Sequence, residues 1–412
     1  MKRGPVELLA PCGSMESLAA AIQAGCHAVY FGVEQLNMRA RSSACFSVSD
    51  IQNVSAIARK HGIKAYLTLN TLMYDHDIFL MRSIIDEAKR QMIDAVIACD
   101  HAVLSYARGK GLPVHISTQA SISNIEAVRF YSAYADVMVL ARELTLEQVR
   151  SIVRGIEKQE IKGPSGKLVR IEVFAHGALC MAVSGRCYLS LHSQFASANR
   201  GACVQNCRRS FIVTDKEDGH RYEISNEYIM SAADLCTIGF LDKLIDAGIA
   251  VLKIEGRGRN EHYVHTVTGC YREAIDAVRS GNYTQERIRK WEEKLRSVFN
   301  RGLWEGYYLG RTIGEWNDTP GSKASRKRVY IGKCIKHFEQ AGVGEFRIES
   351  HSIGIGDDII ISGPTTGVIE GKVRELRTDN IGRKKAAKGT VVSIPVSRKV
   401  RPSDKLYKLV DA

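Results

Sequence analysis

Short apolar segments alternate with amphipathic segments over roughly the first two thirds of the chain, and this alternation limits the fold more than any other feature. The apolar segments have the length and the β-branched content of buried strands. They predict strands at residues 7–10, 28–31, 64–69, 95–99, 114–118, 137–140, 171–175 and 251–254. The segments between them have apolar residues at helical spacing and often end at Gly. They predict helices at residues 14–24, 50–61, 79–92, 101–108, 125–134 and 145–156.

Strands that are apolar along their whole length are buried on both faces, which is typical of a parallel sheet. Eight strands that alternate with helices are enough to close a (β/α)8 barrel of the TIM type. An open, doubly wound sheet is the alternative, because it shows the same alternation. We therefore predict an α/β fold with a TIM-like barrel over residues 1–315.

Two segments interrupt the alternation. After the seventh strand, a segment rich in Cys, Arg, Ser and Asn predicts an insertion at about residues 177–226, with a hairpin that pairs 211–214 with 222–224. Such an insertion would lie over the carboxyl ends of the strands, where barrel enzymes hold their active sites. A turn-rich linker follows at 316–328. Residues 329–412 then predict a small β-barrel or sandwich with strands at 329–334, 345–348, 358–361, 368–374, 389–394 and 404–408.

The net charge of +13 and the pI near 9.2 suit a polyanionic partner such as nucleic acid. From Gly321 onward Lys and Arg outnumber Asp and Glu by about two to one, so most of the excess charge lies in the C-terminal domain. An unspecific surface bias is the alternative. We find no segment apolar and long enough to span a membrane, and no secretory leader after Met1. We therefore expect a cytoplasmic protein, in which clustered thiols serve metal or redox chemistry rather than disulfides.

Four of the eleven cysteines gather in the insertion, at Cys180, Cys187, Cys203 and Cys207, and Cys236 is a fifth candidate. Four thiolates can hold tetrahedral zinc or an iron–sulfur cluster. Zinc ribbons favour paired Cys-x2-Cys sequences, which are absent here, whereas a cubane accepts wider spacing. Unrelated buried thiols are the third reading, but the surroundings are polar and Gly-rich. Arginines next to the cysteines would offset the negative charge of a cluster, namely Arg186, Arg200, Arg208 and Arg209.

Several motifs resemble the collagenase-like peptidase family of unassigned mechanism, family thirty-two, and the likeness extends over nearly the whole chain. The most specific motifs are EVFAHGALC at 172–180 and SGRCYLS at 184–190. Further matching motifs are ELLAPCGS at 7–14, AVYFG at 28–32, STQA at 117–120, LAREL at 140–144 and LKIEGR at 252–257.

This resemblance implies an oxygen-independent hydroxylase rather than a protease. The members that the chain resembles most include tRNA hydroxylases, which make 5-hydroxyuridine at the wobble position with prephenate as the donor. Other members hydroxylate a cytidine of large-subunit rRNA or act on ubiquinone precursors. The resemblance also implies a 4Fe-4S cluster on Cys180, Cys187, Cys203 and Cys207, and in some relatives a downstream cysteine, here Cys236, replaces the fourth ligand. It further implies RNA and a small-molecule donor as partners, and leaves open a partner subunit or a homodimer.

Polar residues at or near the strand ends would face a common pocket in a barrel. As acid or base groups we expect Glu143, Glu172, His176 and Glu255. As substrate-binding groups we expect Asn70, His115, Gln119, Arg142 and Arg257, because guanidinium groups bind carboxylates in bidentate geometry. Arg39, Arg41 and Arg259 are reserves for the same role, and Asp100 and Lys253 also fall near strand ends. The alternative for the charged residues is a set of salt bridges inside the barrel, and for Asn70 a helix cap.

Three functions compete. The first is an RNA hydroxylase whose basic C-terminal domain binds RNA phosphates. The second is a peptidase, but the chain has neither an H-E-x-x-H nor a G-x-S-x-G motif, and a Cys180–His176 pair is the only nucleophile and base it offers at close spacing. The third is a non-catalytic RNA-binding scaffold with a structural cluster. The number of polar residues at the strand ends favours an enzyme.

Overall fold

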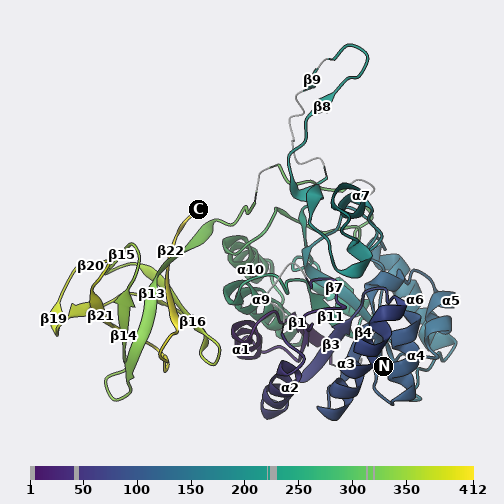
Figure 1. Ribbon diagram of the computed structural model, residues 1–412, viewed down its shortest axis with the longest axis horizontal. Helices are drawn as coiled ribbons and strands as arrows, with labels where there is room; N and C mark the ends of the chain where they lie inside the picture. Colours follow the sequence, from purple (N-terminus) through teal and green to yellow (C-terminus); the bar gives the residue numbers. More distant parts are fainter. Residues whose placement is uncertain (1–4, 41–45, 220, 223–229, 312–313, 319–320) are drawn as a thin grey trace.

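The computed structural model describes residues 5–412 except 41–45, 220, 223–229, 312–313 and 319–320. Figure 1 shows two parts, a barrel surrounded by helices and a smaller β-rich module beside it. The reserve residue Arg41 and the expected hairpin residue Ile224 lie outside the described residues. No helix in the described part of the chain is long and apolar enough to cross a membrane.

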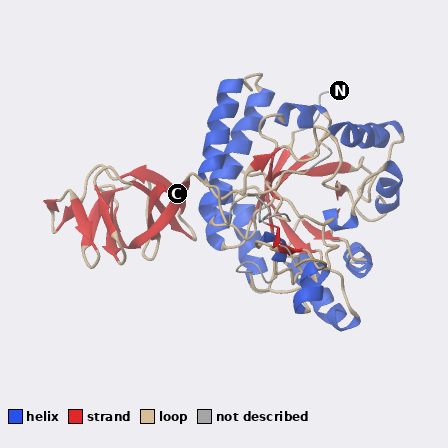
Figure 2. Ribbon diagram, turned by 90° about the horizontal axis from the view of Figure 1, so that it is seen from above, coloured by secondary structure: helices blue, strands red, loops and turns tan. Residues whose placement is uncertain are grey.

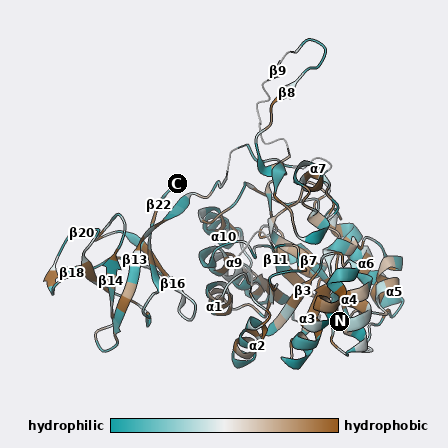
Figure 3. Ribbon diagram, in the orientation of Figure 1, coloured by the Kyte–Doolittle hydropathy of each residue, from teal (hydrophilic) through white to brown (hydrophobic). Residues whose placement is uncertain are grey.

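Eight parallel strands close into a barrel, which confirms the (β/α)8 prediction and rules out the open sheet. Closure is shown by the last strand, which pairs with the first strand on one side and with the seventh on the other. The barrel strands are β1 (Glu7–Pro11), β2 (Ala28–Phe31), β3 (Lys64–Leu69), β4 (Ala95–Ala98), β5 (Val114–Ile116), β6 (Val137–Val139), β7 (Arg170–Ala178) and β11 (Val251–Ile254). Hydrophobic residues gather on these strands in Figure 3, as the apolar segments of the sequence predict.

The helices form a ring around the strands, which Figure 2 shows from above. Polar residues begin several of them: Ser14, Asp100, Asn124 and Thr145 each accept a hydrogen bond from the first turn of the following helix. The ring helices are α1 (Met15–Gln23), α2 (Asp50–Lys60), α3 (Ile78–Arg90), α4 (His101–Gly109), α5 (Ile125–Tyr131), α6 (Leu146–Lys158), α8 (Leu241–Asp246) and α9 (Glu261–Arg279), and α10 (Gln285–Ser297) packs against α9. All six expected helices are present.

The insertion after β7 contains little regular structure. It holds α7 (Leu189–Gln194), two 3-10 turns (Ala198–Arg200 and Asn206–Arg208) and the hairpin of β8 (Val213–Thr214) with β9 (Arg221–Tyr222). The hairpin forms where we expected it and extends away from the barrel in Figure 1. Two strands that we did not expect follow: β10 (Asp234–Cys236) lies antiparallel to β7, and β12 (Leu303–Trp304) pairs with β10.

The C-terminal module is an antiparallel sheet in the order β17-β16-β22-β13-β14-β21-β18-β19. Its strands are β13 (Arg326–Phe338), β14 (Val343–Ile348), β16 (Asp358–Gly363), β17 (Gly367–Lys372), β18 (Arg377–Thr378), β19 (Ile381–Gly382), β21 (Val391–Pro395) and β22 (Lys405–Asp411), and β15 (Ser352–Gly354) pairs separately with β20 (Lys385–Ala387). Six of these match the expected strands, although β13 begins at Arg326 rather than at residue 329. The module has its own apolar core, which includes Ile331, Phe346 and Leu406.

The module contacts the barrel through α1 and α9. The Gln23 side chain exchanges two hydrogen bonds with the backbone of Val368, at 2.7 and 2.9 Å. Arg328 pairs with Glu261 at the start of α9. Ala20 also packs against Ile360 and Val368. The module is therefore seated on the helical ring, away from the strand ends that carry the insertion.

Candidate functional site

A cavity of about 330 Å³ opens at the carboxyl ends of the barrel strands, beneath the insertion. Its floor and walls come from strand ends, for example Tyr30, Thr68 and Phe174, and its roof comes from the insertion, for example Leu189 and Ser190. Its volume lies in the range of small-ligand pockets. Barrel enzymes hold their active sites at this face.

All four clustered cysteines line this cavity. Cys180 directly follows β7, Cys187 precedes α7, and Cys207 lies in the 3-10 turn Asn206–Arg208. Burial raises the pKa of the Cys207 thiol, Arg208 lowers it, and the other three cysteines raise it further. Among the described residues, however, no three His, Cys, Asp or Glu side chains are gathered closely enough to hold a metal ion as they stand.

Cys236 is placed differently. It lies on β10, opposite His176, and is not among the residues that line the cavity. Its sulfur lies 3.9 Å from the Tyr271 hydroxyl, and burial raises the pKa of its thiol to about 11. Of the two candidates for a fourth ligand, Cys207 lines the same cavity as Cys180, Cys187 and Cys203, and Cys236 does not.

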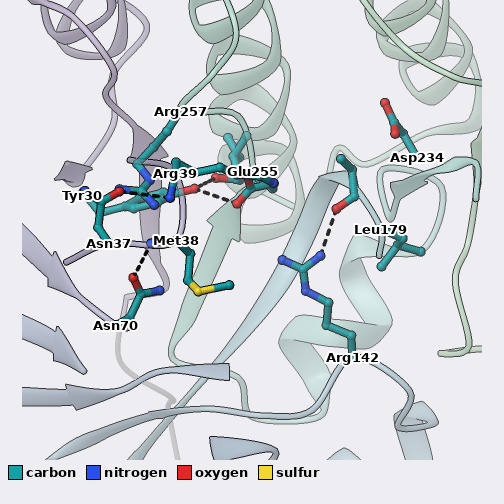
Figure 4. Close-up of polar contacts among 12 residues, drawn as sticks. Tyr30, Asn37, Met38, Arg39, Asn70, Arg142, Leu179, Asp234, Glu255 and Arg257 are labelled. Carbon is teal, nitrogen blue, oxygen red and sulfur yellow. Dashed lines mark hydrogen bonds and ion pairs between the residues drawn. The ribbon is translucent and has the colours of Figure 1, made fainter. Parts of the chain in front are cut away.

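Glu255 is the one carboxylate among the described residues that line the cavity. Its Oε1 accepts hydrogen bonds from Arg39 Nη2 at 2.8 Å and Nε at 3.2 Å, and its Oε2 accepts one from the Tyr30 hydroxyl at 3.2 Å. Burial raises the pKa of this carboxyl, but the charges of Arg39, Arg142 and Arg257 outweigh burial and lower the pKa to about 2. Figure 4 shows Arg39 and Glu255 in contact, with Arg257 beside them.

Arg142 holds a half-buried positive charge that attracts Glu255 without a direct ion pair to a carboxylate among the described residues. Its Nη1 donates to the carbonyl oxygen of Ala178 at 2.8 Å, and its guanidinium lies 3.7 Å from the centre of the Phe174 ring. Its Nε is buried and has no hydrogen-bond partner among the described residues. Burial lowers the pKa of Arg142, which expresses the cost of keeping this charge away from water. Such a group favours the binding of an anion beside it.

Five further cations line the cavity: Arg208, Lys253, Arg257, Arg259 and Arg301. Arg257 donates to Thr68 Oγ1 at 2.7 Å and to Asn37 Oδ1 at 3.0 Å, so neutral oxygens hold it in place. Arg301 lies 3.7 Å from Asp234, a buried carboxylate of β10 outside the cavity lining. The cavity is therefore strongly cationic, and it suits a ligand with two or more negative charges.

Lys253 links the cavity floor to a polar group in the barrel interior. Its Nζ donates to Glu172 Oε1 at 2.8 Å and lies over the Tyr30 ring. The other oxygen, Glu172 Oε2, is 3.9 Å from His115 Nδ1, and neither atom has a hydrogen-bond partner among the described residues. Burial raises the pKa of Glu172 and lowers that of His115 well below its usual value. Glu172 and His115 lie below the cavity and do not line it.

His176 also lies outside the cavity lining. Its Nδ1 is 3.4 Å from the Tyr271 hydroxyl of α9, and burial lowers its pKa to about 3, so the ring is neutral at pH 7. His176 lies outside the cavity lining because the register of β7 against β11 shifts. Lys253 pairs with Phe174, but the next residue, Ile254, pairs with His176. The extra residue turns His176 toward the helices while Phe174 faces the cavity.

Of the remaining expected residues, some line the cavity and others do not. Asn70 and Gln119 line the cavity, and Asn70 accepts a hydrogen bond from the Met38 backbone at 3.2 Å rather than capping a helix. Glu143 is exposed and does not line the cavity. Asp100 caps α4 through the Ala102 N–H.

Sequence reasoning did not single out Tyr30, Met38 or Arg301 as site residues, although all three line the cavity. Tyr30 lies near the end of β2, so its position in the expected strand could have identified it as a site residue. Arg301 lies in the chain segment that leads into β12, far from any strand of the barrel in sequence. Only the pairing of β12 with β10 brings it to the cavity.

Comparison with known proteins gives a consistent set of relatives. The family described as "Peptidase family U32" matches residues 13–318. A protein named collagenase from Porphyromonas gingivalis is 57% identical over 98% of this chain and 97% of its own length. The tRNA hydroxylation protein P1 of Bacillus subtilis is 28% identical over 98% of this chain and 94% of its own. A 23S rRNA 5-hydroxycytidine synthase of Escherichia coli is 35% identical over 66% of this chain and 40% of its own.

Proposed function

The chain belongs to peptidase family U32, and from this membership and the charge of the cavity we propose that it is an oxygen-independent RNA hydroxylase. Relatives named for tRNA hydroxylation and rRNA hydroxycytidine synthesis support this choice of reaction. The observation that carries the proposal is the cavity itself, where four thiols and buried cations surround a single carboxylate among the described residues.

The four thiols fit an iron–sulfur cluster by their chemistry. One cavity is lined by Cys180, Cys187, Cys203 and Cys207. All four offer sulfur rather than oxygen as a ligand atom, and thiolates are the ligands of such clusters. Arg208, next to Cys207, would balance part of the negative charge of a thiolate-bound 4Fe-4S cluster. When bound, such a cluster supplies one-electron transfer at the cavity wall.

The arginines fit a small anionic donor. Arg142 offers a half-buried charge whose Nε has no hydrogen-bond partner among the described residues, and Arg257 lines the cavity while donating to Thr68 and Asn37. Two guanidinium groups that follow β6 and β11, strands separated in the barrel only by β7, can each bind one carboxylate of a dicarboxylate such as prephenate. Glu255 keeps Arg39 from competing for the same ligand, because the two are already paired.

For the RNA substrate we propose tRNA, with 5-hydroxyuridine at the wobble position as the product. The basic C-terminal module, seated on α1 and α9, would contribute phosphate contacts outside the cavity. Hydroxylation of an rRNA cytidine is the nearest alternative, because the cavity charge does not distinguish one pyrimidine from another.

A peptidase is the second candidate, and the name of the 57% identical relative favours it. The described residues give it little support. His176, the expected base for Cys180, contacts Tyr271 instead and is not part of the cavity lining.

Nucleoside mass spectrometry of tRNA and rRNA from a strain that lacks this protein tests the function. We expect the loss of one hydroxypyrimidine, restored by the wild-type chain. Unchanged RNA, together with loss of cleavage of a collagen peptide, would overturn the proposal in favour of the peptidase.

Matched serine variants test the cluster. After anaerobic purification we expect about four irons per wild-type chain. Cys207→Ser should lose most of the iron, and Cys236→Ser should keep it, because only Cys207 shares the cavity with the other three thiols. The opposite pattern would make Cys236 the fourth ligand, and one zinc per chain without iron would reject the cluster.

A further inference from the structure

The insertion exposes large aromatic side chains around the cavity mouth. Tyr188 stands between Cys187 and Leu189, which both line the cavity, yet 78% of Tyr188 is exposed. Phe195, at the other end of α7, is 95% exposed. Other aromatic residues of the chain are exposed singly, for example Phe79 on α3, whereas Tyr188 and Phe195 flank one helix whose first residue, Leu189, lines the cavity. Two on one short helix, beside a cavity, therefore call for a binding partner.

Phe195 is also held in an unfavourable backbone conformation. It ends α7 with φ 51° and ψ 30°, in the left-handed region where Gly or Asn is preferred. A bulky residue there costs folding energy of its own. Its side chain recovers none of this cost through burial, because nearly all of it faces solvent. The aromatic ring at this position therefore serves something other than stability.

The charge around these rings is uniformly positive. From Leu179 to Thr214 the sequence contains four arginines and no Asp or Glu. Arg186 and Arg209 are exposed and form no ion pair among the described residues. Arg186 stands between Gly185 and Cys187, which line the cavity. A polyanion is the partner that this surface favours.

The insertion is fixed to the barrel rim. Arg200 pairs with Asp77 and stacks over Tyr74 at 3.9 Å. The Asn199 carbonyl accepts a hydrogen bond from Leu72 N–H at 3.1 Å. Gly201 packs so closely that a Cβ would lie 2.2 Å from the Asn37 carbonyl oxygen. The rings are therefore presented by a segment that is already positioned before a partner binds.

We propose that Tyr188, Phe195, Arg186 and Arg209, together the aromatic rim, bind the unpaired nucleotides of an RNA loop. The rings stack on bases next to the target, the arginines bind the flanking phosphates, and the target base enters the cavity. Stacking on aromatic side chains suits single-stranded RNA, because the bases of a duplex are not available for it. This inference rests on the proposed RNA substrate and adds that the substrate is recognised as a loop.

A stem-loop RNA with 2-aminopurine in the loop tests the aromatic rim in the full-length protein. Tyr188→Ala and Phe195→Ala should each weaken binding by about 10-fold or more and reduce the fluorescence quenching that stacking causes. The matched control is Phe130→Ala, since Phe130 on α5 is 60% exposed but far along the chain from the insertion. It should leave both signals unchanged. Binding of a fully paired RNA of equal length should not depend on either ring.

Phe195→Gly separates binding from folding. Gly adopts the left-handed conformation without strain, so this variant should melt at the same temperature as the wild type or higher, yet bind the loop as weakly as Phe195→Ala. If both Phe195 variants bind the loop like the wild type while the wild type still hydroxylates RNA, the inference fails and the proposed function stands. If they keep RNA affinity but accept electrons more slowly from an acidic redox protein, the rim belongs to that protein partner instead.

Discussion

The molecule carries positive charge in two regions that differ in burial. In the cavity, Arg142 is half-buried and its buried Nε has no hydrogen-bond partner among the described residues, and one carboxylate among the described lining residues faces seven cations. In the C-terminal module, cations such as Lys384 and Lys385 are exposed to water. The module holds most of the net charge of the sequence. The cavity holds the charges that lower the stability of the fold, because they are partly removed from water.

This difference shows why net charge was a poor guide to the site. Exposed charges are solvated and screened, so they cost little and indicate little. A buried guanidinium without a counterion lowers stability, and a folded chain retains it when a ligand supplies the missing charge. The following predictions test this contrast, beginning with the largest expected effect.

Arg142→Met removes the half-buried charge while keeping an apolar side chain over Phe174. We expect RNA hydroxylation to fall by about 10- to 100-fold, because a charge-assisted contact to the ligand is lost. We expect thermal stability to change little, because the substitution removes the desolvation cost of the cation together with its attraction to Glu255. Hydroxynucleoside yield and thermal denaturation measure the two effects.

Arg398→Met in the module is the control, since Arg398 is exposed. It should change neither quantity. If Arg142→Met unfolds enough of the protein to account for the whole loss of hydroxynucleoside yield, Arg142 acts as a structural residue.

Glu255→Gln removes the carboxylate that Arg39, Arg142 and Arg257 hold at a pKa of about 2. A carboxyl with a lowered pKa stabilises the fold above its unfolded value near 4.5, and this contribution is lost as the pH falls toward 2. We expect the variant to be less stable than the wild type by on the order of 3 kcal/mol at pH 7. The difference should shrink between pH 4.5 and 2 in denaturant titrations. A difference that does not depend on pH would contradict the charge account.

Arg186→Ala tests the smaller contribution of an exposed charge on the insertion. We expect loop RNA to bind a few times more weakly, and the slope of log K against log salt to fall by about 0.7, the value for one phosphate of a single strand. Binding titrations at several salt concentrations measure the slope. An unchanged slope would remove Arg186 from the RNA interface.

Lys385→Ala in the module should have the smallest effect. Lys385 is exposed, and its charge is screened within about 8 Å at physiological salt. We expect less than about a twofold change in RNA affinity and no change in melting temperature. A larger loss than that of Arg186→Ala would place the main RNA contact on the module instead of the insertion.

The sequence predicted the barrel well because its strands are short continuous apolar segments whose burial is local in sequence. It missed β10, since Asp234–Cys236 includes a carboxylate and forms a strand only by pairing with β7 and β12, which are distant in sequence. The four cysteines were recognised because their spacing is itself a local signal.

The finer assignment of site residues depended on features that one sequence does not display. Strand β7 runs from Arg170 to Ala178, so Glu172 stands near its beginning, below the cavity, as it also does in the expected strand at 171–175; counting it among the strand-end residues was wrong. The register shift in the same strand turns His176 outward. Glu255 and Arg142, at true strand ends, do line the cavity. Which strand-end residue faces the site thus follows from strand length and register.

The most direct test of the account is nucleoside mass spectrometry of RNA from a strain that lacks this protein and expresses wild-type, Cys180→Ser or Arg142→Met chains at equal levels. We predict that the wild type restores a hydroxypyrimidine and that neither variant does, because one removes a thiol from the cavity and the other its unpaired charge. Full restoration by Arg142→Met, or RNA that is the same with and without the protein, would contradict the claim that this cavity hydroxylates RNA.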